Sequence, residues 1–287
     1  MALAVSGGAD SLALLVLASA AGLKATAWHV DHGLREGSDL EAERVAKVAA
    51  AYGAGFDGRT LTVTPGPDLE ARARAARYSV LPAGVLTGHT MDDQAETVLL
   101  NLLRGAGPDG LAGIRAHKTG HTAAPRRPLL GLRRRDTEAI CEAEGLVPFR
   151  DPTNDDPRFR RNRVRHEVIP LLSDVAGRDV VPVLARQAEL ISDEVSLLES
   201  LTAGIDPTDA RSVREAPVPL ARRALRRWLR APDSGGDSEA HPASSAEIER
   251  VLAVARGTAT ACEIAGGRRV ARSVGRLSVE PLSPEPR

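Results

Sequence analysis

Short apolar stretches alternate with longer stretches of helical periodicity over the first 105 residues, and this alternation constrains the fold most. The expected strands are residues 3–5, 24–30, 59–64 and 84–89, and the expected helices are residues 9–21, 38–52, 68–81 and 92–105. Strands that alternate with helices form βαβ units, which assemble into a parallel sheet with helices on both faces. The sequence therefore predicts an α/β domain with a doubly wound, Rossmann-like sheet, whose ligands bind at the carboxyl ends of the strands.

The turn after the first expected strand reads Ser6-Gly7-Gly8-Ala9-Asp10-Ser11. Glycines allow a ligand to approach the backbone closely, and the N-terminus of the following helix favours an anion such as phosphate. The chain has no G-x-x-x-x-G-K-[ST] sequence, and this turn does not continue into G-x-G-x-x-G. The Asp10 carboxylate would repel phosphate unless a cation lay between them, so the turn indicates a Mg²⁺–nucleotide complex with Asp10 on the metal. The alternative is an ordinary helix start capped by Ser6 or Asp10.

Two further polar clusters follow expected strands, Asp31 and His32 after the second strand and His89 to Asp93 after the fourth. Because the carboxyl ends of parallel strands meet at one edge of a sheet, we expect all three clusters to lie close together. This convergence favours the nucleotide interpretation over a simple helix cap. For His29 and His32, packing or capping roles remain an open alternative.

Composition and charge exclude several classes of protein. The 38 Lys and Arg residues balance 38 Asp and Glu residues, so no overall field favours a polyanion. Cys141 and Cys262 lie far apart in the sequence and form no metal or redox motif. No apolar run is long enough to cross a membrane. We therefore expect a reduced, cytoplasmic protein without a membrane segment.

The second half of the chain differs in pattern from the first. A Gly- and Pro-rich loop runs over residues 105–131, a helix is expected at 133–146, and a polar connector enters a helix at about 163–172. Beyond residue 180 the pattern is mainly helical, and alternation around Gly266-Gly267 indicates a small hairpin. We expect a nucleotide-binding domain over residues 1–150, a connector over 151–178 and a smaller, mainly helical domain over 179–287.

The glycine turn resembles the PP-loop of the ATP pyrophosphatases, and four further stretches resemble the bacterial tRNA(Ile)-lysidine synthetases. These stretches are residues 29–35, 69–78, 87–105 and 150–170, and their order and spacing also match. The resemblance is strong over residues 3–170, and H-x-x-D-D-Q-x-E-T narrows it to this one family. It implies an enzyme that uses ATP to ligate free lysine to the wobble cytidine of the isoleucine tRNA with a CAU anticodon. The implied steps are adenylation of the ring carbonyl oxygen and displacement of AMP by the lysine ε-amine, giving lysidine and changing the codon read from AUG to AUA.

The resemblance also implies roles for particular residues. ATP binding falls to Ser6, Gly7, Gly8, Ala9, Asp10, Ser11, Val30, Asp31 and His89. It implies that Asp10 and Asp93 bind magnesium and that Asp92, Asp93 and Glu96 bind lysine. The implied catalytic residues are Asp10, Asp93, Arg74 and Arg77. Transfer RNA falls to Arg161, Asn162, Arg163 and Arg165. The alternatives are helix-start acids favoured by the dipole at 92–96 and a solvated helix face at Arg74 and Arg77.

Seven arginines and one acid, Glu215, occur in residues 211–230. On a helix starting near Pro219, the spacing places Arg222, Arg223, Arg226 and Arg230 within one broad face. We expect this face to bind the tRNA backbone, since like charges four residues apart repel unless a polyanion lies between them. The alternative is that these arginines pair with acids elsewhere in the fold.

The chain departs from the longer members of the family at both ends. It begins at Met1 directly before the first strand, where relatives usually carry a helix, and it ends without their additional C-terminal domain. We therefore expect a short form of the family. At the N-terminal end, either the true start of the protein lies upstream of Met1 or the protein lacks one packing element. The oligomeric state is open, and a homodimer is one option. Two other functions are alternatives. A PP-loop enzyme that thiolates tRNA would need paired cysteines, and a non-catalytic nucleotide sensor would not need the acids at 92–96.

Overall fold

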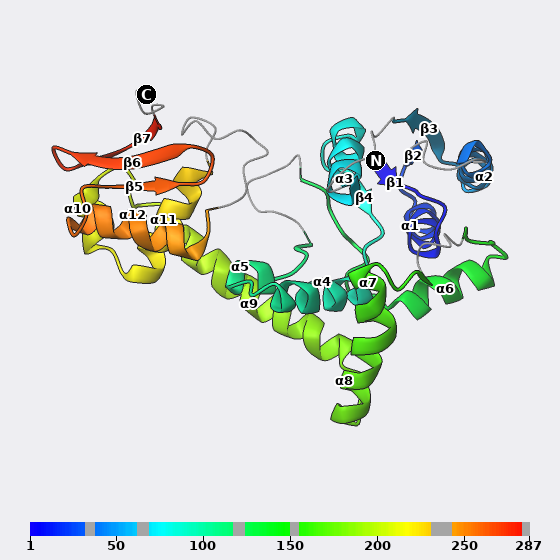
Figure 1. Cartoon of the computed structure of the whole chain (residues 1–287). Coiled ribbons are helices and arrows are strands. Elements are labelled where there is room, and N and C mark those ends of the chain that lie inside the picture. The colour runs from blue at the N-terminus through cyan, green and yellow to red at the C-terminus, as the bar shows by residue number, and fades with distance from the viewer. Residues whose placement is uncertain (32–37, 62–68, 117–123, 150–154, 231–242, 283–287) are drawn as a thin grey trace. The chain divides into compact units, whose positions relative to one another are not determined.

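The computed structural model describes residues 1–31, 38–61, 69–116, 124–149, 155–230 and 243–282 (Figure 1). The chain forms two compact units, Met1–Ser192 and Asp193–Arg287, which divide within helix α9 (Val181–Thr202). The expected division at residues 150 and 178 stays a prediction, because compactness alone does not test the role of each segment.

The first unit is built on a four-stranded parallel sheet, which confirms the predicted α/β fold. Its strands are β1 (Ala2–Ala4), β2 (Thr26–Asp31), β3 (Gly55–Thr60) and β4 (Leu86–Thr87), in the order β3-β2-β1-β4. The chain moves outward from β1 to β3 and then crosses to the other side of β1. The strand order therefore reverses between β1 and β4, the position at which doubly wound sheets bind their ligands.

The helices of the first unit are α1 (Ala9–Ala20), α2 (Ser38–Ala51), α3 (Leu69–Val80), α4 (Met91–Leu103) and α6 (Arg134–Ala143). Helix α1 is buried over most of its surface because its sequence is apolar on all sides, from Leu12 to Val16. It packs with Leu3 of β1, with Val5 directly after this strand and with Cys141 of α6 in the largest described core of this unit. This core fixes the turn between β1 and α1.

Two local expectations were wrong. The third strand was expected at residues 59–64, of which 62–64 lie outside the described residues. In the structure β3 begins earlier, at Gly55, because the chain pairs with β2 soon after α2 ends. The segment 105–131 was expected to be a long loop. It contains the short helix α5 (Pro108–Leu111), and its return at Arg126 forms a parallel bridge with Leu86. This bridge supports β4, which is only two residues long.

The connector continues into three successive helical segments, α7 (Arg160–Arg163), the π-helical turn η2 (Val164–Val168) and α8 (Ile169–Ala176). The expected helix at about residues 163–172 therefore starts earlier and ends later. A π-turn inside a helix is rare and often lies at a functional site. Val164 and the C-terminal part of α4 share a small core with Leu184.

The second unit packs helices α10 (Ala210–Glu215), α11 (Val218–Leu229) and α12 (Ser245–Arg256) against an antiparallel sheet (Figure 1). The sheet has the order β5 (Ala261–Ile264), β6 (Arg268–Ser273) and β7 (Arg276–Pro281). The expected hairpin at Gly266-Gly267 is present and gains a third strand. The second turn contains Val274 at φ 48°, which a β-branched residue seldom adopts, so the sequence did not signal it.

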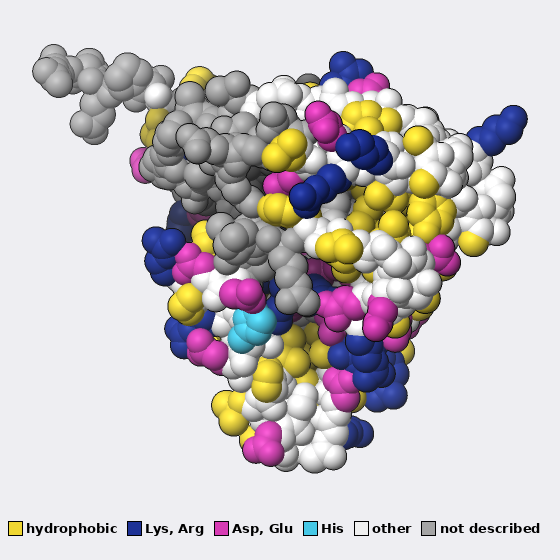
Figure 2. All heavy atoms as spheres, turned by 90° about the vertical axis from the view of Figure 1, so that its right-hand side faces the viewer, with side chains coloured by type: hydrophobic (Ala, Val, Ile, Leu, Met, Phe, Trp, Pro, Cys, Tyr) yellow, Lys and Arg dark blue, Asp and Glu magenta, His cyan; other side chains and the backbone are white. Residues whose placement is uncertain are grey.

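Acidic and basic side chains lie next to one another over the face drawn in Figure 2, in keeping with the balance of 38 bases and 38 acids. Among the described residues, no helix combines the length and the apolar character needed to span a membrane.

Candidate functional site

The turn between β1 and α1 exposes the start of a helix that no side chain of the described residues caps. Gly8 is the N-cap residue of α1, and because it has no side chain it cannot accept a hydrogen bond from the first helical N–H groups. Gly7 has φ 87°, and its carbonyl oxygen accepts a hydrogen bond from the Phe149 N–H at 2.9 Å. The Ser11 hydroxyl donates to the Gly8 carbonyl at 2.9 Å and accepts from the Ser6 N–H at 3.1 Å. The hydroxyls thus hold the turn, while the first amides of α1 face a potential anion.

The end of β4 packs directly on this turn. A Cβ on Gly88 would lie 2.6 Å from the Asp10 carbonyl oxygen, so only glycine fits there without a shift of the backbone. The side chain of His89 follows, and its Nδ1 lies 2.8 Å from the Thr87 hydroxyl. This close approach brings the start of α4 beside the glycine turn, as predicted for the first and third polar clusters.

Asp10 is not a helix cap, because Gly8 occupies that position. Its carboxylate reaches α6, where the Thr137 hydroxyl donates a hydrogen bond to it and the Arg134 guanidinium lies 3.7 Å away. Burial raises the pKa of Asp10 above its ordinary value, and the nearby charge of Asp93 adds to this; the Thr137 hydrogen bond and the Arg134 charge oppose the shift only in part.

The acids of α4 have partners on other segments. Asp92 accepts hydrogen bonds from the Arg133 Nε at 3.1 Å and from the Arg134 backbone N–H at 2.7 Å. Asp93 accepts from the Thr90 N–H at 2.9 Å, in a capping box, and pairs with Arg134 at 3.3 Å and Arg161 at 3.1 Å. Burial acts to raise the pKa of Asp93, but these two arginines and the Thr90 N–H together hold it below its ordinary value.

Glu96 lies at the centre of the cluster. Its side chain is 0% exposed and accepts from three guanidiniums, those of Arg134 at 3.2 Å, Arg161 at 2.7 Å and Arg165 at 2.7 Å. Such a carboxylate can remain buried because several charge-assisted hydrogen bonds replace its hydration. We call Asp10, Asp93, Glu96, Arg134, Arg161 and Arg165 the acid–arginine cluster.

Arg134 is the member of the acid–arginine cluster that no sequence motif indicated. Its guanidinium contacts Asp10, Asp93 and Glu96, and the charges of these three acids raise its pKa. A signal was available. Arg133, Arg134 and Arg135 precede or open α6, where the helix dipole disfavours cations, so a run of arginines there needs carboxylate partners.

The other predicted ATP residues lie near this edge or outside the described part. Val30 and Asp31 end β2, and the Asp31 carbonyl accepts from the Leu61 N–H at 2.7 Å. His29 is buried with its Nδ1 2.9 Å from the Val5 carbonyl oxygen, which is a packing role. His32 and the side chain of Arg74 fall outside the described residues. The Arg77 guanidinium lies 5.5 Å from the ring centre of Tyr78.

The four residues assigned to tRNA on α7 and η2 divide between two environments. Arg161 and Arg165 turn inward to Glu96, and the buried Asn162 donates its amide to the Asp156 carbonyl at 2.9 Å. Arg163 is exposed and pairs with Glu167 at 2.8 Å. Contact of these residues with tRNA stays a prediction.

The arginines of α11 do not form one solvent-exposed face. Arg222 is exposed and pairs with Glu249 at 2.5 Å, whereas the Arg223 side chain is only 14% exposed and lies 3.9 Å from Glu199. Arg226 is half-buried. Pairing with acids elsewhere in the fold, the stated alternative, is therefore observed for Arg222 and Arg223. Binding of tRNA by Arg222, Arg223 and Arg226 stays untested.

Comparison with known proteins places these features in a family. The model of the PP-loop domain family matches residues 1–172. The tRNA(Ile)-lysidine synthase of Nocardia farcinica is 44% identical over 80% of this chain and 75% of its own length. That of Salinispora tropica is 43% identical over 96% of this chain and 89% of its own length.

A solved structure shares the fold. The U34-tRNA thiolase NcsA from Methanococcus maripaludis, with its [4Fe-4S] cluster, matches with a TM-score of 0.55 over 67% of this chain and 71% of the thiolase. The two sequences are only 17% identical, so this likeness shows the fold alone.

Proposed function

This chain belongs to the tRNA(Ile)-lysidine synthase family, and we propose that it ligates free L-lysine to the wobble cytidine of the isoleucine tRNA with a CAU anticodon. ATP first adenylates the carbonyl oxygen of the cytosine ring, and pyrophosphate leaves. The lysine ε-amine then attacks the ring carbon, a carbon–nitrogen bond forms, and AMP leaves. The product lysidine changes decoding from AUG to AUA. We place this reaction in the cytoplasm.

One observation carries the proposal: the uncapped start of α1 and the acid–arginine cluster lie on the same edge of the sheet, joined through Asp10. Ring adenylation requires that the phosphates of ATP be aligned with an oxygen of the base, and it needs no covalent nucleophile on the protein. Backbone amides at a helix start provide the anion site, and Gly7 and Gly8 let the phosphates come close to it.

Asp10 and Asp93 fit the magnesium ion that ATP chemistry implies. Both carboxylates contact the Arg134 guanidinium, Asp10 at 3.7 Å and Asp93 at 3.3 Å, so they lie on either side of one side chain. Among the described residues, no group of three His, Cys, Asp or Glu side chains could hold a metal. Magnesium does not need such a group, because one or two carboxylates and the substrate phosphates suffice. When bound, the ion would neutralise charge on the departing pyrophosphate.

We propose different roles for the two acids of α4 that face α6 and α7. Asp93 is 14% exposed at its side chain and is the acid that the lysine ammonium or the metal can contact. Glu96 is fully buried and accepts from three arginines, so we assign it a supporting role. It fixes Arg134 and Arg161, which in turn hold Asp93 in place.

The direct test is nucleoside analysis of the tRNA after reaction. The full chain is incubated with the isoleucine tRNA transcript, ATP, Mg²⁺ and isotope-labelled lysine, and the digested tRNA is analysed for lysidine. The elongator methionine tRNA, which shares the CAU anticodon, is the specificity control. We expect labelled lysidine in the isoleucine tRNA, with one AMP formed for each lysine incorporated. ATP consumption without lysine in the tRNA would contradict the proposed reaction.

A further inference from the structure

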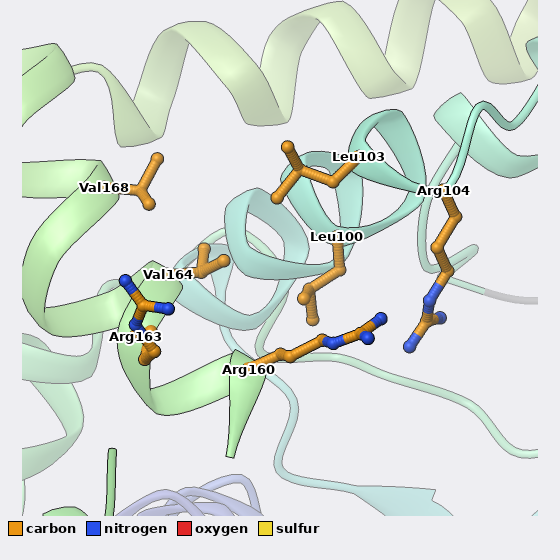
Figure 3. A pocket seen from close by; sticks show the side chains of 7 residues that line it. All are labelled: Leu100, Leu103, Arg104, Arg160, Arg163, Val164 and Val168. Atoms are coloured by element: carbon orange, nitrogen blue, oxygen red, sulfur yellow. The ribbon is translucent and has the colours of Figure 1, made fainter. Parts of the chain in front are cut away.

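A pocket of about 370 Å³ lies on the first unit beside the acid–arginine cluster and shares no residue with it (Figure 3). The C-terminal part of α4 and the segments α7 and η2 form its walls. Leu100, Leu103, Val164 and Val168 line it with apolar surface. The guanidiniums of Arg104, Arg160 and Arg163 lie around this surface. We call the four apolar residues the pocket floor.

The helical period separates the pocket from the acid–arginine cluster. On α7 and η2, Arg161 and Arg165 turn to Glu96, while Arg160 and Arg163 line the pocket. Along α4, Leu103 lies seven residues after Glu96, a rise of about 10 Å at 1.5 Å per residue. The pocket is therefore distinct from the candidate ATP site but close enough for one RNA loop to reach both.

Among the described residues, two of the three arginines have no acidic partner. Arg163 pairs with Glu167 at 2.8 Å. Neither Arg104 nor Arg160 has an ion-pair partner within the part of the chain that the structure describes. Figure 3 shows their guanidiniums pointing toward the same end of the pocket, beside Leu100. Two cations that converge on an apolar surface repel each other, and an anion between them would relieve this repulsion.

We propose that this pocket binds one nucleotide of the tRNA substrate, other than the nucleotide that reacts, with its base on the pocket floor and its phosphate between Arg104 and Arg160. The proposal rests on the proposed function, which makes RNA the substrate. A nucleotide combines a flat base, whose two faces are apolar, with an anionic phosphate, which matches an apolar floor flanked by arginines. Proteins that read single-stranded RNA loops bind unstacked bases, in part against the planes of Arg guanidiniums. The volume of the pocket lies within the usual range of about 300–1,000 Å³ for ligand sites.

The test compares tRNA binding by the full chain and by three variants over a range of salt concentrations. Arg104→Gln with Arg160→Gln removes the charges that would bind the phosphate, and Leu103→Gln makes the exposed part of the floor polar. Arg178→Gln with Arg186→Gln is the matched control, since it removes two exposed arginines from the same unit. Unfolding midpoints and ATP affinity are measured for all variants to confirm that the fold is kept.

We expect the Arg104/Arg160 variant to bind tRNA at least about tenfold more weakly than the control pair. When a protein neutralises one phosphate fewer on a single strand, the slope of log affinity against log salt becomes shallower by about 0.7, and we expect a change of that size. Leu103→Gln should weaken binding and leave the slope unchanged. The proposal would be overturned if the Arg104/Arg160 variant bound tRNA as tightly as the control pair. It would also be overturned if Leu103→Gln left tRNA binding unchanged.

The outcomes also separate this proposal from the proposed function. If the wild-type chain forms lysidine and the pocket variants bind tRNA as well as the wild-type chain does, the pocket proposal is refuted and the proposed reaction is supported. Wild-type chain that binds tRNA through the pocket and forms no lysidine would refute the reaction and support the pocket.

Discussion

Replacement of Glu96 by glutamine should destabilise the first unit strongly. The Glu96 side chain is 0% exposed and accepts from Arg134, Arg161 and Arg165 at 3.2 Å or less. Glutamine keeps the size of the side chain but removes its charge and adds two N–H donors. Three guanidiniums, each at most 35% exposed, would then face an amide with only one acceptor oxygen.

The magnitude follows from the partners that remain. Removing one member of a buried ion pair costs about 3–5 kcal/mol, because the other charge stays buried without compensation. Arg134 and Arg161 keep Asp93 as a partner, so we expect a loss near the lower end, about 3 kcal/mol. For a unit of this size, each kcal/mol lowers the midpoint of thermal unfolding by about 2–4 °C. The expected shift is therefore about 6–12 °C.

Tryptophan fluorescence can follow the first unit alone. The chain has two tryptophans, Trp28 on β2 of the first unit and Trp228 on α11 of the second. In a Trp228→Phe background, thermal unfolding is recorded from Trp28 with and without Glu96→Gln. Glu142→Gln, which changes an exposed acid of α6, is the control. If the two substitutions lower the midpoint equally, the buried cluster contributes no more to stability than a surface acid, and the reasoning fails.

Three further outcomes follow from the site and from α11. Asp10→Asn should fold normally and lose AMP formation, and an active variant at ordinary Mg²⁺ concentration would show that Asp10 does not serve the metal. Gly88→Ala should lower the free energy of unfolding in urea by about 1–3 kcal/mol and weaken ATP binding, because the added Cβ would lie 2.6 Å from the Asp10 carbonyl oxygen. The control is Gly107→Ala, which should change neither quantity because no atom lies within 4 Å of the added Cβ. Arg223→Ala with Arg226→Ala should weaken tRNA binding and flatten its salt dependence, and unchanged binding in a filter assay would remove α11 from the RNA interface.

The sheet could be predicted from the sequence because its signals are local. Apolar stretches such as residues 3–5, followed by a glycine turn and a helical pattern, specify a βα unit without reference to distant residues. The position of β3 could not be predicted in the same way. Its start at Gly55 depends on pairing with Thr26, and this register is set by how soon the chain leaves α2.

The candidate site shows the same division. Asp10, Asp93 and Glu96 belong to motifs that the sequence displays, whereas Arg134 belongs to none of them. Its three partners lie 38 or more positions earlier in the sequence, so only the folded chain reveals that it joins them. The sequence also could not show that Arg161 and Arg165 face inward, because a helical arginine is compatible with either side of its helix.

The charges of the acid–arginine cluster explain why a metal ion would be needed beside it. Three carboxylates, those of Asp10, Asp93 and Glu96, face the three guanidiniums of Arg134, Arg161 and Arg165, so the cluster carries no net formal charge. Arginines elsewhere often bind phosphate directly, but here their donors are engaged by carboxylates. Under the proposed function, the described residues can then attract a triphosphate through the amides of α1 and through an added cation, which we propose Asp10 and Asp93 hold. Loss of the Asp10 charge would leave the cluster positive, which favours the phosphates, and would remove a metal ligand, which impairs the reaction. Asp10→Asn is therefore expected to separate ATP binding, which persists, from AMP formation, which does not.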